Sequence, residues 1–415
     1  MTARHFILTP VGSSGDVHPY VGLGRALRAR GHDVTLVTSE PFRNVGERAG
    51  LRFLPTHSSA EFEELSKHPD LWHAQRGLRL VLRAGARALP VEYARIAEAY
   101  RPGQSVLVGH ALAFAARIFE EKHRVPAATL QLAPSIFRSL HRQPVHLPGR
   151  DTSRYPRWLK RTLWWLIDRV AIDPLIVPAV NRFRRELGLR RVSRIFHSWL
   201  HSPQRVIGLF PDWFAPPQPD WPPQLRLTGF PLYDESDQHA LPGELEAFLT
   251  NGTPPVVFTP GSANRAAGAF FRSAVDAAAR LDRRALLLTR YPEQIPQPLP
   301  PTVRHEVYLP FSQVLPRCAA LVHHGGVGTC AQGLAAGIPQ LVMPLGFDQP
   351  DNAARLEQLG VGRWIVPRRF TPDGVARALG ALLEAENVRA RCRRWAEAVR
   401  RTDAVSDTCM LLEEL

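Results

Sequence analysis

The sequence predicts an α/β protein built from two parallel-sheet domains of similar size. Two series of short apolar runs alternate with helix-like segments, one in the first 134 residues and one from residue 254 onward. Between them lies a stretch rich in Trp, Pro and Arg, roughly 137–225. Strand, loop, helix and strand at this spacing form right-handed βαβ units, and such units require a parallel sheet.

The first series begins with "RHFILT" (4–9), a short apolar strand that runs into the Gly/Ser turn "PVGSSGD". Residues 18–31 follow as an amphipathic helix, and "DVTLVTS" (33–39) is the next strand. Two further buried strands are expected at 104–110 and 126–134.

The second series has six segments with strand-like runs, at 254–265, 284–290, 303–310, 318–324, 339–344 and 362–366. The predicted organisation is an N-terminal domain (1–228), a linker (229–250), a C-terminal domain (251–390) and a C-terminal helix (391–415) expected to return to the N-terminal domain. Ligands of such sheets bind at the carboxyl ends of the strands, so an interdomain cleft is the expected active site.

Composition limits the class of protein. A hydrophobic content of 45% and a charged content of 22% in 415 residues are those of a folded globular chain. The four cysteines have no CxxC spacing, which argues against a disulfide framework or a zinc site and fits a reducing cytoplasm. The net charge of +14 is spread along the chain without a nucleic-acid-binding motif, so an anionic substrate or membrane surface is favoured over nucleic acid.

The chain shows no predicted membrane span. The apolar start is too short for a signal peptide and is interpreted as a buried strand. The longest candidate, "LWWLIDRVAIDPLIVPAV", is interrupted by charged residues and by proline. A cytoplasmic protein, with peripheral contact at the inner membrane face, is therefore expected.

The segment 320–352 predicts a ligand site. The strand "ALVHH" runs into "GGVGT" and a helix, which places unpaired backbone N–H groups at a helix N-terminus. Such an end binds anions, and the glycines let a diphosphate approach the backbone. The spacing is neither a P-loop nor GxGxxG. His324 precedes the helix as a donor expected to carry positive charge near neutral pH, and Asp348-Gln349 suit sugar hydroxyls.

This segment resembles the donor-binding signature of the inverting GT-B glycosyltransferases, in which an HxG turn, a helix and a terminal DQ follow in that order. The resemblance implies the GT-B fold, with two Rossmann-like parallel-sheet domains facing an interdomain cleft. It implies that the N-terminal domain (1–228) binds the acceptor and that the C-terminal domain (251–390) binds the nucleotide-sugar donor. It implies that His324 contacts the diphosphate and that Asp348 and Gln349 hold the sugar. The full donor-binding set that it implies is Ser262, Tyr308, His324, Gly326, Gly328, Thr329, Gln332, Asp348 and Gln349.

Three members of this set carry particular expectations. Gln332 stands where many relatives have a Glu that grips the ribose, so the amide either weakens that role or indicates a deoxyribose donor. "VYLPFSQVL" resembles the segment that packs on the nucleobase, with Tyr308 as the stacking ring. In "TPGSAN", Ser262 is expected to reach the phosphate. No metal or cofactor is expected, because the helix N-terminus and His324 would stabilise the leaving diphosphate.

The loop "GSSGDVHP" resembles the GSxGDxxP loop of bacterial antibiotic, sterol and lipid glycosyltransferases. The resemblance implies that Asp16 is the base that takes the acceptor proton. The alternative is that Asp16 only caps the following helix, and the two roles can coexist. Ser14, His18 and His110 are further candidates on the acceptor side.

The chain as a whole resembles most the rhamnosyltransferase chain of rhamnolipid biosynthesis, on "GSSGDVHPYVGLGRAL", "HPDLW" and the stretch from residue 198. This implies transfer of L-rhamnose from dTDP-L-rhamnose to a 3-(3-hydroxyalkanoyloxy)alkanoate, giving mono-rhamnolipid. The alternative within the same chemistry is a UDP-glucose-dependent enzyme acting on a sterol, polyketide or other hydrophobic acceptor. The alternative of another class is a non-catalytic accessory subunit. The Trp/Arg-rich middle segment could be core, acceptor pocket or membrane-facing surface.

Overall fold

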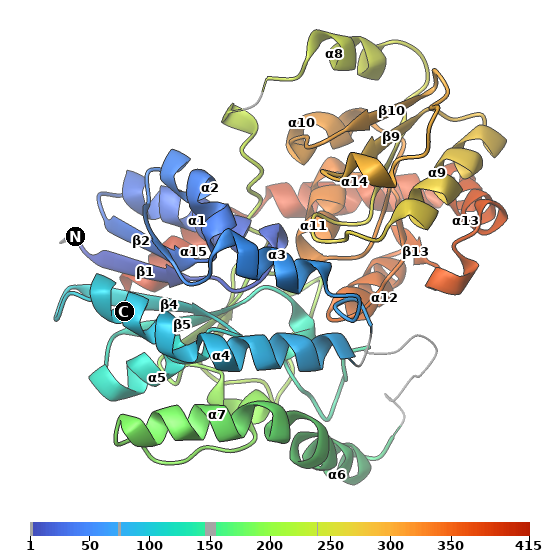
Figure 1. Ribbon diagram of the computed structural model, residues 1–415. Helices are drawn as coiled ribbons and strands as arrows, with labels where there is room; N and C mark the ends of the chain where they lie inside the picture. The colour runs from blue at the N-terminus through green and yellow to red at the C-terminus, as the bar shows by residue number, and fades with distance from the viewer. Residues whose placement is uncertain (1–2, 74–75, 146–154, 239) are drawn as a thin grey trace. The chain divides into compact units, whose positions relative to one another are not determined.

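The computed structural model describes residues 3–73, 76–145, 155–238 and 240–415, and the chain divides into two compact units (Figure 1). The amino-terminal unit holds the described residues of 3–145, 155–231 and 403–415, and the carboxyl-terminal unit holds those of 232–402. Residues 146–154, which the sequence assigns to the first domain, lie outside the described residues.

The amino-terminal unit is built on a seven-stranded parallel sheet of order β3-β2-β1-β4-β5-β6-β7. Its strands are β1 (His5–Thr9), β2 (Asp33–Thr38), β3 (Arg52–Pro55), β4 (Ser105–His110), β5 (Ala127–Gln131), β6 (Arg205–Gly208) and β7 (Leu225–Leu227). Its helices are α1 (Ser14–Ala29), α2 (Arg43–Arg48), α3 (Ser59–Lys67), α4 (Arg76–Ala99), α5 (Phe114–His123), α6 (Arg157–Ile167), α7 (Asp173–Glu186) and α15 (Ala404–Glu413). It also contains the π-helical turns η3 (Asp168–Ile172) and η4 (Ile195–Trp199) and the short 3-10 turns η1 (Glu40–Phe42) and η2 (Pro134–Ile136).

The core of this unit lies between the sheet and α4, α5 and α7, because alternate strand residues such as Ile7 and Leu107 face the buried apolar stripes of these helices. Helix α15 packs on α1 and is fastened by Glu413, which accepts from Arg30 at 3.0 Å and pairs with His32 at 3.0 Å. The chain end thus belongs to the amino-terminal unit.

The carboxyl-terminal unit is built on a six-stranded parallel sheet of order β10-β9-β8-β11-β12-β13. Its strands are β8 (Val256–Thr259), β9 (Ala285–Leu288), β10 (Val303–Glu306), β11 (Ala320–His323), β12 (Gln340–Val342) and β13 (Gly362–Trp364). Its helices are α8 (Gly243–Thr250), α9 (Gly268–Arg280), α10 (Phe311–Val314), α11 (Val327–Ala336), α12 (Gln349–Leu359), α13 (Pro372–Glu384) and α14 (Glu386–Arg400).

Both faces of the second sheet are covered. One set of alternate strand residues packs with α9 and α13, and the other packs with Leu245 and Leu249 of α8 and with Val314. Helix α8 therefore packs in this unit, although the sequence assigned its residues to the linker 229–250. Helix α14 also lies here, so within the predicted segment 391–415 only residues 403–415 join the amino-terminal unit.

Helix α1 starts four residues earlier than the sequence predicts. It begins at Ser14 instead of residue 18, because Ser13 and Asp16 form a capping arrangement that draws part of the Gly/Ser turn into the first helical turn. Pro19 is accommodated inside the helix near this start.

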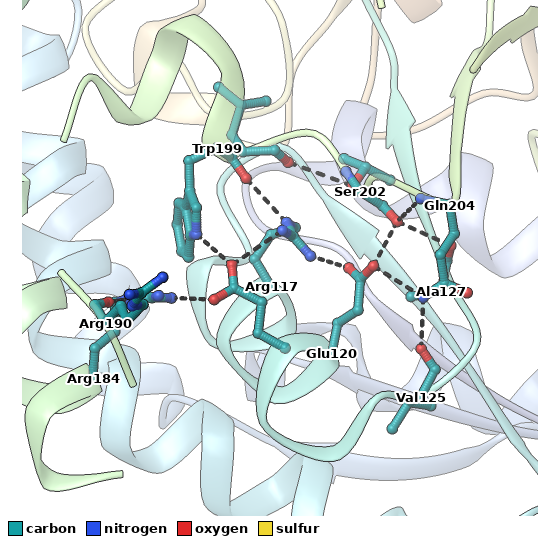
Figure 2. A network of polar contacts seen from close by, with 12 residues as sticks. Arg117, Glu120, Val125, Ala127, Arg184, Arg190, Trp199, Ser202 and Gln204 are labelled. Carbon is teal, nitrogen blue, oxygen red and sulfur yellow. Dashed lines mark hydrogen bonds and ion pairs between the residues drawn. The ribbon is translucent and has the colours of Figure 1, made fainter. Parts of the chain in front are cut away.

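A buried polar network fastens α5 to the segment that leads into β6 (Figure 2). Arg117 donates to the Glu120 carboxylate and to the carbonyl oxygen of Trp199, the latter at 3.0 Å. Glu120 also accepts from Ser202 Oγ at 2.7 Å and from Gln204 Nε2 at 3.1 Å. The charges of this network are thus paired and hydrogen-bonded, the condition under which burial of charge is tolerated.

Candidate active site

The predicted catalytic residue, Asp16, lies in the first turn of α1 at the carboxyl end of β1. Its Oδ2 accepts from the Ser13 backbone N–H at 2.7 Å and from Ser13 Oγ at 3.1 Å. Both bonds go to Oδ2, so Asp16 caps the helix through one carboxylate oxygen. Gly12, at φ +138°, leaves room for this carboxylate, because a side chain there would collide with it.

Tyr20 and His110 surround this carboxylate in the amino-terminal unit. Tyr20 stands one helical turn after Asp16, and its ring meets that of His110 edge-on at 6.4 Å. Burial, and then the negative charge of Asp16, raise the pKa of Tyr20 well above its usual value. Burial lowers the pKa of His110, and the Asp16 charge acts in the opposite direction. The three side chains therefore form one electrostatic cluster.

The hydrogen bonds of this cluster define its chemistry. The Leu112 N–H donates to His110 Nδ1 at 3.3 Å, so Nδ1 is the acceptor and the proton of the neutral ring is on Nε2. The Tyr20 hydroxyl is buried and has no hydrogen-bond partner among the described residues. The sequence did not single out Tyr20, although its i+4 spacing from Asp16 was a usable signal.

The other two acceptor-side candidates lie on α1 but differ in direction. Ser14 is the first residue of the helix and is half-buried. His18 is also half-buried, but two residues along a helix correspond to a turn of roughly 200°, so it faces away from Asp16. His110 is brought close enough to Asp16 for the charge of the carboxylate to act on its ring.

In the carboxyl-terminal unit, His324 follows β11 and its ring lies between two glycines. A Cβ on Gly261 would lie 2.7–2.9 Å from three ring atoms, and one on Gly326 would lie 2.7 Å from Nε2. Gly261, at φ +91°, comes from the loop after β8, the strand that neighbours β11. The backbones of Gly261 and Gly326, which carry no side chains, thus lie against the imidazole, and we call this arrangement the clasp on His324.

The expectation that His324 carries positive charge near neutral pH is wrong for the ligand-free protein. Loss of solvation lowers its pKa to about 4, so the ring is neutral at pH 7. Nδ1 is buried without a partner among the described residues. The adjacent His323 stays in the core, with Nδ1 accepting from the Gly325 N–H at 3.1 Å.

Helix α11 begins directly after His324, with Gly326 as its N-cap. The N–H groups of its first turn have no acceptor within the helix, and the helix dipole makes this end positive. Gly328 is exposed and open space surrounds its α-carbon, while Thr329 is half-buried beside it. Gln332 lies one turn further and is buried. The geometry is that of an anion site.

The turn after β12 is joined to the turn after β11 by Asn352, a residue that the sequence did not single out. Its Nδ2 donates to the Asp348 carboxylate at 2.7 Å and to the Gly325 carbonyl at 2.9 Å. Its Oδ1 has no partner among the described residues. Asp348 is the half-buried N-cap residue of α12.

Gln349 differs from the expectation that its side chain is free to meet sugar hydroxyls. It is buried, and its Oε1 accepts from the N–H groups of Leu345 at 2.7 Å and Gly346 at 3.2 Å. The carbonyl oxygen therefore closes the turn that presents Asp348. The Nε2 group of the Gln349 amide takes no part in these two hydrogen bonds.

Tyr308 and Ser262 extend the site along the same edge of the sheet. Tyr308 follows β10, is exposed, and donates from Oη to the Asp234 carbonyl at 2.6 Å, which fixes the ring. Ser262 is exposed next to Gly261. In the order of the strands, the edge presents Tyr308 (β10), Ser262 (β8), His324 (β11) and Asp348 (β12). Four strand spacings separate β10 from β12, roughly 19 Å.

Three further features of the described residues concern metal binding, membrane spans and the cysteines. Among the described residues, no group of three or more His, Cys, Asp and Glu side chains is placed to bind a metal ion. The described residues also contain no helix that is both long and apolar enough to cross a bilayer. The four cysteines are unpaired and buried.

Comparison with known proteins gives relatives over the whole chain. Residues 6–141 match the glycosyltransferase family 28 N-terminal domain, and residues 272–410 match the erythromycin biosynthesis protein CIII-like C-terminal domain. The O-mycaminosyltylonolide 6-deoxyallosyltransferase of Streptomyces fradiae is 32% identical over 430 residues, covering 98% of this chain and 96% of that protein.

Solved structures agree on the fold. The glycosyltransferase of kitacinnamycin superposes with a TM-score of 0.77 at 22% identity, covering 100% of this chain and 99% of that one. The spinosyn rhamnosyltransferase SpnG, solved with thymidine diphosphate, gives 0.67 at 20% identity, covering 99% and 100%. These likenesses do not show the expected closeness to the rhamnolipid rhamnosyltransferase chain. The chain belongs to the glycosyltransferases of GT-B fold, with a family 28 amino-terminal domain and an EryCIII-like carboxyl-terminal domain.

Proposed function

We propose that this glycosyltransferase moves a deoxysugar from a dTDP-sugar to a hydroxyl of a hydrophobic, polyketide-type acceptor, with inversion and without a metal ion. One observation carries the donor half of this proposal. The sheet edge presents an aromatic ring, a hydroxyl, a helix N-terminus with His324, and a carboxylate in that order over roughly 19 Å. A nucleotide-sugar has base, diphosphate and sugar in the same order.

The choice of dTDP over UDP rests on two supports. Gln332 occupies the place of a ribose-gripping Glu, and a 2′-deoxyribose has one hydroxyl fewer to grip. The similarly folded spinosyn rhamnosyltransferase was solved with thymidine diphosphate. The acceptor class rests on the relative at 32% identity, whose name describes a tylonolide acceptor. The proposed acceptor agrees better with the polyketide alternative of the sequence analysis than with its prediction of a rhamnolipid precursor.

The proposed mechanism uses residues of this chain alone. Asp16 takes the proton of the acceptor hydroxyl as its oxygen bonds to the anomeric carbon, and the bond from that carbon to the diphosphate breaks on the opposite face. The first-turn N–H groups of α11 and the neutral His324 ring donate hydrogen bonds to the departing diphosphate. Ser13 holds the Asp16 carboxylate in place through two hydrogen bonds, and the buried side chains of Tyr20 and His110 lie within reach of its charge.

Calorimetric titration with dTDP, UDP, dTDP-rhamnose and UDP-glucose, in the presence of EDTA, tests the donor half. We expect tighter binding of the dTDP ligands than of the UDP ligands, and no effect of EDTA. A preference for UDP-glucose would overturn the dTDP assignment, and binding only after a divalent ion is added would overturn the metal-free mechanism. If no nucleotide bound, the accessory-subunit alternative would replace the proposal.

Transfer assays then test the acceptor half, with a macrolide aglycone, a sterol and a 3-(3-hydroxyalkanoyloxy)alkanoate offered beside the donor that binds. We expect product from the macrolide aglycone. Product from the hydroxyalkanoate alone, with dTDP-L-rhamnose as donor, would restore the rhamnolipid reading.

Asp16→Asn tests the base directly. The amide still accepts the hydrogen bond from Ser13 but cannot take a proton, so kcat should fall about 10²–10⁴-fold while dTDP affinity and thermal stability stay nearly unchanged. Normal turnover in this variant would rule Asp16 out as the base. Asp373→Asn, the same substitution at an exposed aspartate in the first turn of α13, is the matched control and should retain activity.

A further inference from the structure

Helix α6 and the π-helical turn η3 that follows it bury polar residues and expose apolar ones. Lys160 is 2% exposed and Asp168 is 1% exposed. Trp158 is 68% exposed, Trp165 51% and Val170 67%. This is the reverse of the ordinary pattern, in which the apolar stripe of a surface helix faces the core.

Polar contacts hold the helix in this orientation. Asp168 accepts from Arg138 at 2.5 Å and from Arg194 at 3.3 Å. Lys160 Nζ donates to the carbonyls of residues 140 and 141 at 3.2 and 3.3 Å. Rolling the helix to bury its tryptophans would leave these buried charges without partners, which is strongly unfavourable. The exposed aromatic face is therefore fixed by the fold.

The exposed face is also basic. Arg157, Arg161 and Arg169 are exposed between and beside the apolar side chains. Within 157–172 the one acidic residue is Asp168, which is buried and paired. We call this surface the α6 face, and it comprises Arg157, Trp158, Arg161, Trp165, Leu166, Arg169 and Val170.

Helical spacing puts Trp158, Arg161 and Trp165 on one side of α6, and the π-helical turn that follows continues the strip with the exposed Arg169 and Val170. Trp158 and Trp165 are seven residues apart, two turns along the same face, and Arg161 lies between them. Figure 1 shows α6 running into α7 at the rim of the amino-terminal unit. The α6 face is thus a continuous strip of indole rings and guanidinium groups.

We propose that the α6 face binds the surface of an anionic lipid bilayer. Indole rings favour the boundary between headgroups and acyl chains, and arginines beside them pair with lipid phosphates. A helix lying in the interface needs neither the length nor the uniform apolarity of a membrane span. This goes beyond the proposed reaction, since it places the enzyme at a membrane whatever its donor.

A second copy of the chain fits this face less well. In a two-fold dimer the face would meet itself, so three arginines would oppose three arginines with no exposed carboxylate of the strip between them. An anionic bilayer supplies the missing opposite charge. The charge complementarity therefore favours lipid over self-association.

Flotation of the full-length protein with vesicles tests the proposal. Vesicles of phosphatidylcholine are compared with vesicles of phosphatidylcholine and phosphatidylglycerol at low and high salt. We expect binding to the anionic vesicles, weaker binding at high salt, and little binding to the neutral ones. The double variant Arg161→Gln/Arg169→Gln should weaken anionic binding roughly thirtyfold. Trp158→Ser/Trp165→Ser should abolish it.

The matched control is Arg182→Gln/Arg185→Gln, which removes the same charge from two exposed residues of α7. It should bind vesicles like the unaltered protein. All variants should keep the unaltered thermal transition and dTDP affinity, because the changed side chains are exposed and lie outside the donor site.

Three results would overturn the proposal. One is the absence of vesicle binding, and another is binding that the two tryptophan substitutions leave unchanged. The third is a dimer, seen by light scattering without lipid, that the tryptophan variant converts to a monomer. That last result would assign the α6 face to self-association.

Discussion

Two polar clusters of this protein, one in each unit, differ in how completely their buried polar atoms are hydrogen-bonded. In the amino-terminal unit, Glu121 accepts from Arg117 at 3.2 Å, from Arg184 at 2.7 Å and from Trp199 Nε1 at 2.6 Å (Figure 2). In the carboxyl-terminal unit, His324 Nδ1 and Asn352 Oδ1 are buried without partners among the described residues.

The difference separates a structural cluster from a binding one. Buried polar groups are nearly always hydrogen-bonded, and each exception in a native protein needs a physical reason. The network around α5 satisfies its own groups and has no need of a ligand. The turn after β11 combines unpaired imidazole and amide atoms with the open N–H groups of α11, and a diphosphate supplies acceptors for such donors.

Glu120→Gln should break the first cluster and give the largest effect on stability. The amide cannot balance the Arg117 charge, so the free energy of unfolding should fall by about 3 kcal/mol, measured by urea denaturation. The dTDP affinity of the folded protein should not change. Glu98→Gln, an exposed substitution on α4, is the control and should cost under about 0.5 kcal/mol. Equal stability of the two variants would mean that the network contributes little.

Glu92→Gln is the same substitution at a buried carboxyl that the fold leaves unpaired. Glu92 Oε1 has no partner among the described residues, and burial raises the pKa of Glu92 from 4.5 to about 8. The folded state therefore holds a proton that the unfolded state releases above about pH 4.5. The resulting stability is fully present below that pH and is lost as pH rises through about 8.

The Glu92→Gln variant does not lose this stability as pH rises, because the Gln amide does not ionise. Relative to the unaltered protein it should gain about 2.5 kcal/mol of stability between pH 5 and pH 7, measured by thermal unfolding at each pH. Glu120→Gln and Glu92→Gln should thus have opposite signs at pH 8. A difference between variant and unaltered protein that stays constant with pH would show that Glu92 is ionised in the folded state.

His324→Ala should break the second cluster without unfolding the protein. It removes one hydrogen bond to a charged ligand, so dTDP affinity should fall about tenfold to thirtyfold in calorimetry while the thermal transition stays within a few degrees. His305→Ala, on β10, is the control, because its ring bonds the Thr289 carbonyl. Unchanged dTDP affinity in His324→Ala would refute the diphosphate role.

The sequence predicts much of the fold and part of the site. Apolar runs that alternate with helix-like segments indicated both parallel sheets, and the glycines after His324 indicated a helix N-terminus. His110 was a predicted acceptor-side candidate, but the Asn352 bond to Gly325 was not predicted, because it depends on strand order. The charge of His324 was wrongly predicted because burial, which local sequence does not show, sets it. The inverted face of α6 depends on ion pairs with Arg138 and Arg194, at distant positions in the chain.

Gly261 shows this limit most clearly, since it clasps His324 from 63 residues away in the sequence. Gly261→Ala should displace the ring and weaken dTDP binding by several-fold, the smallest of these effects. Gly252→Ala is a matched control: its φ of +88° is close to the +91° of Gly261, but its added Cβ meets Arg284 atoms only at 3.6 Å or more. Both variants carry the strain of a left-handed alanine, about 1 kcal/mol, and should lose similar stability. Only Gly261→Ala should lose affinity. If both variants bound dTDP equally well, the clasp on His324 would be a feature of packing and not of binding.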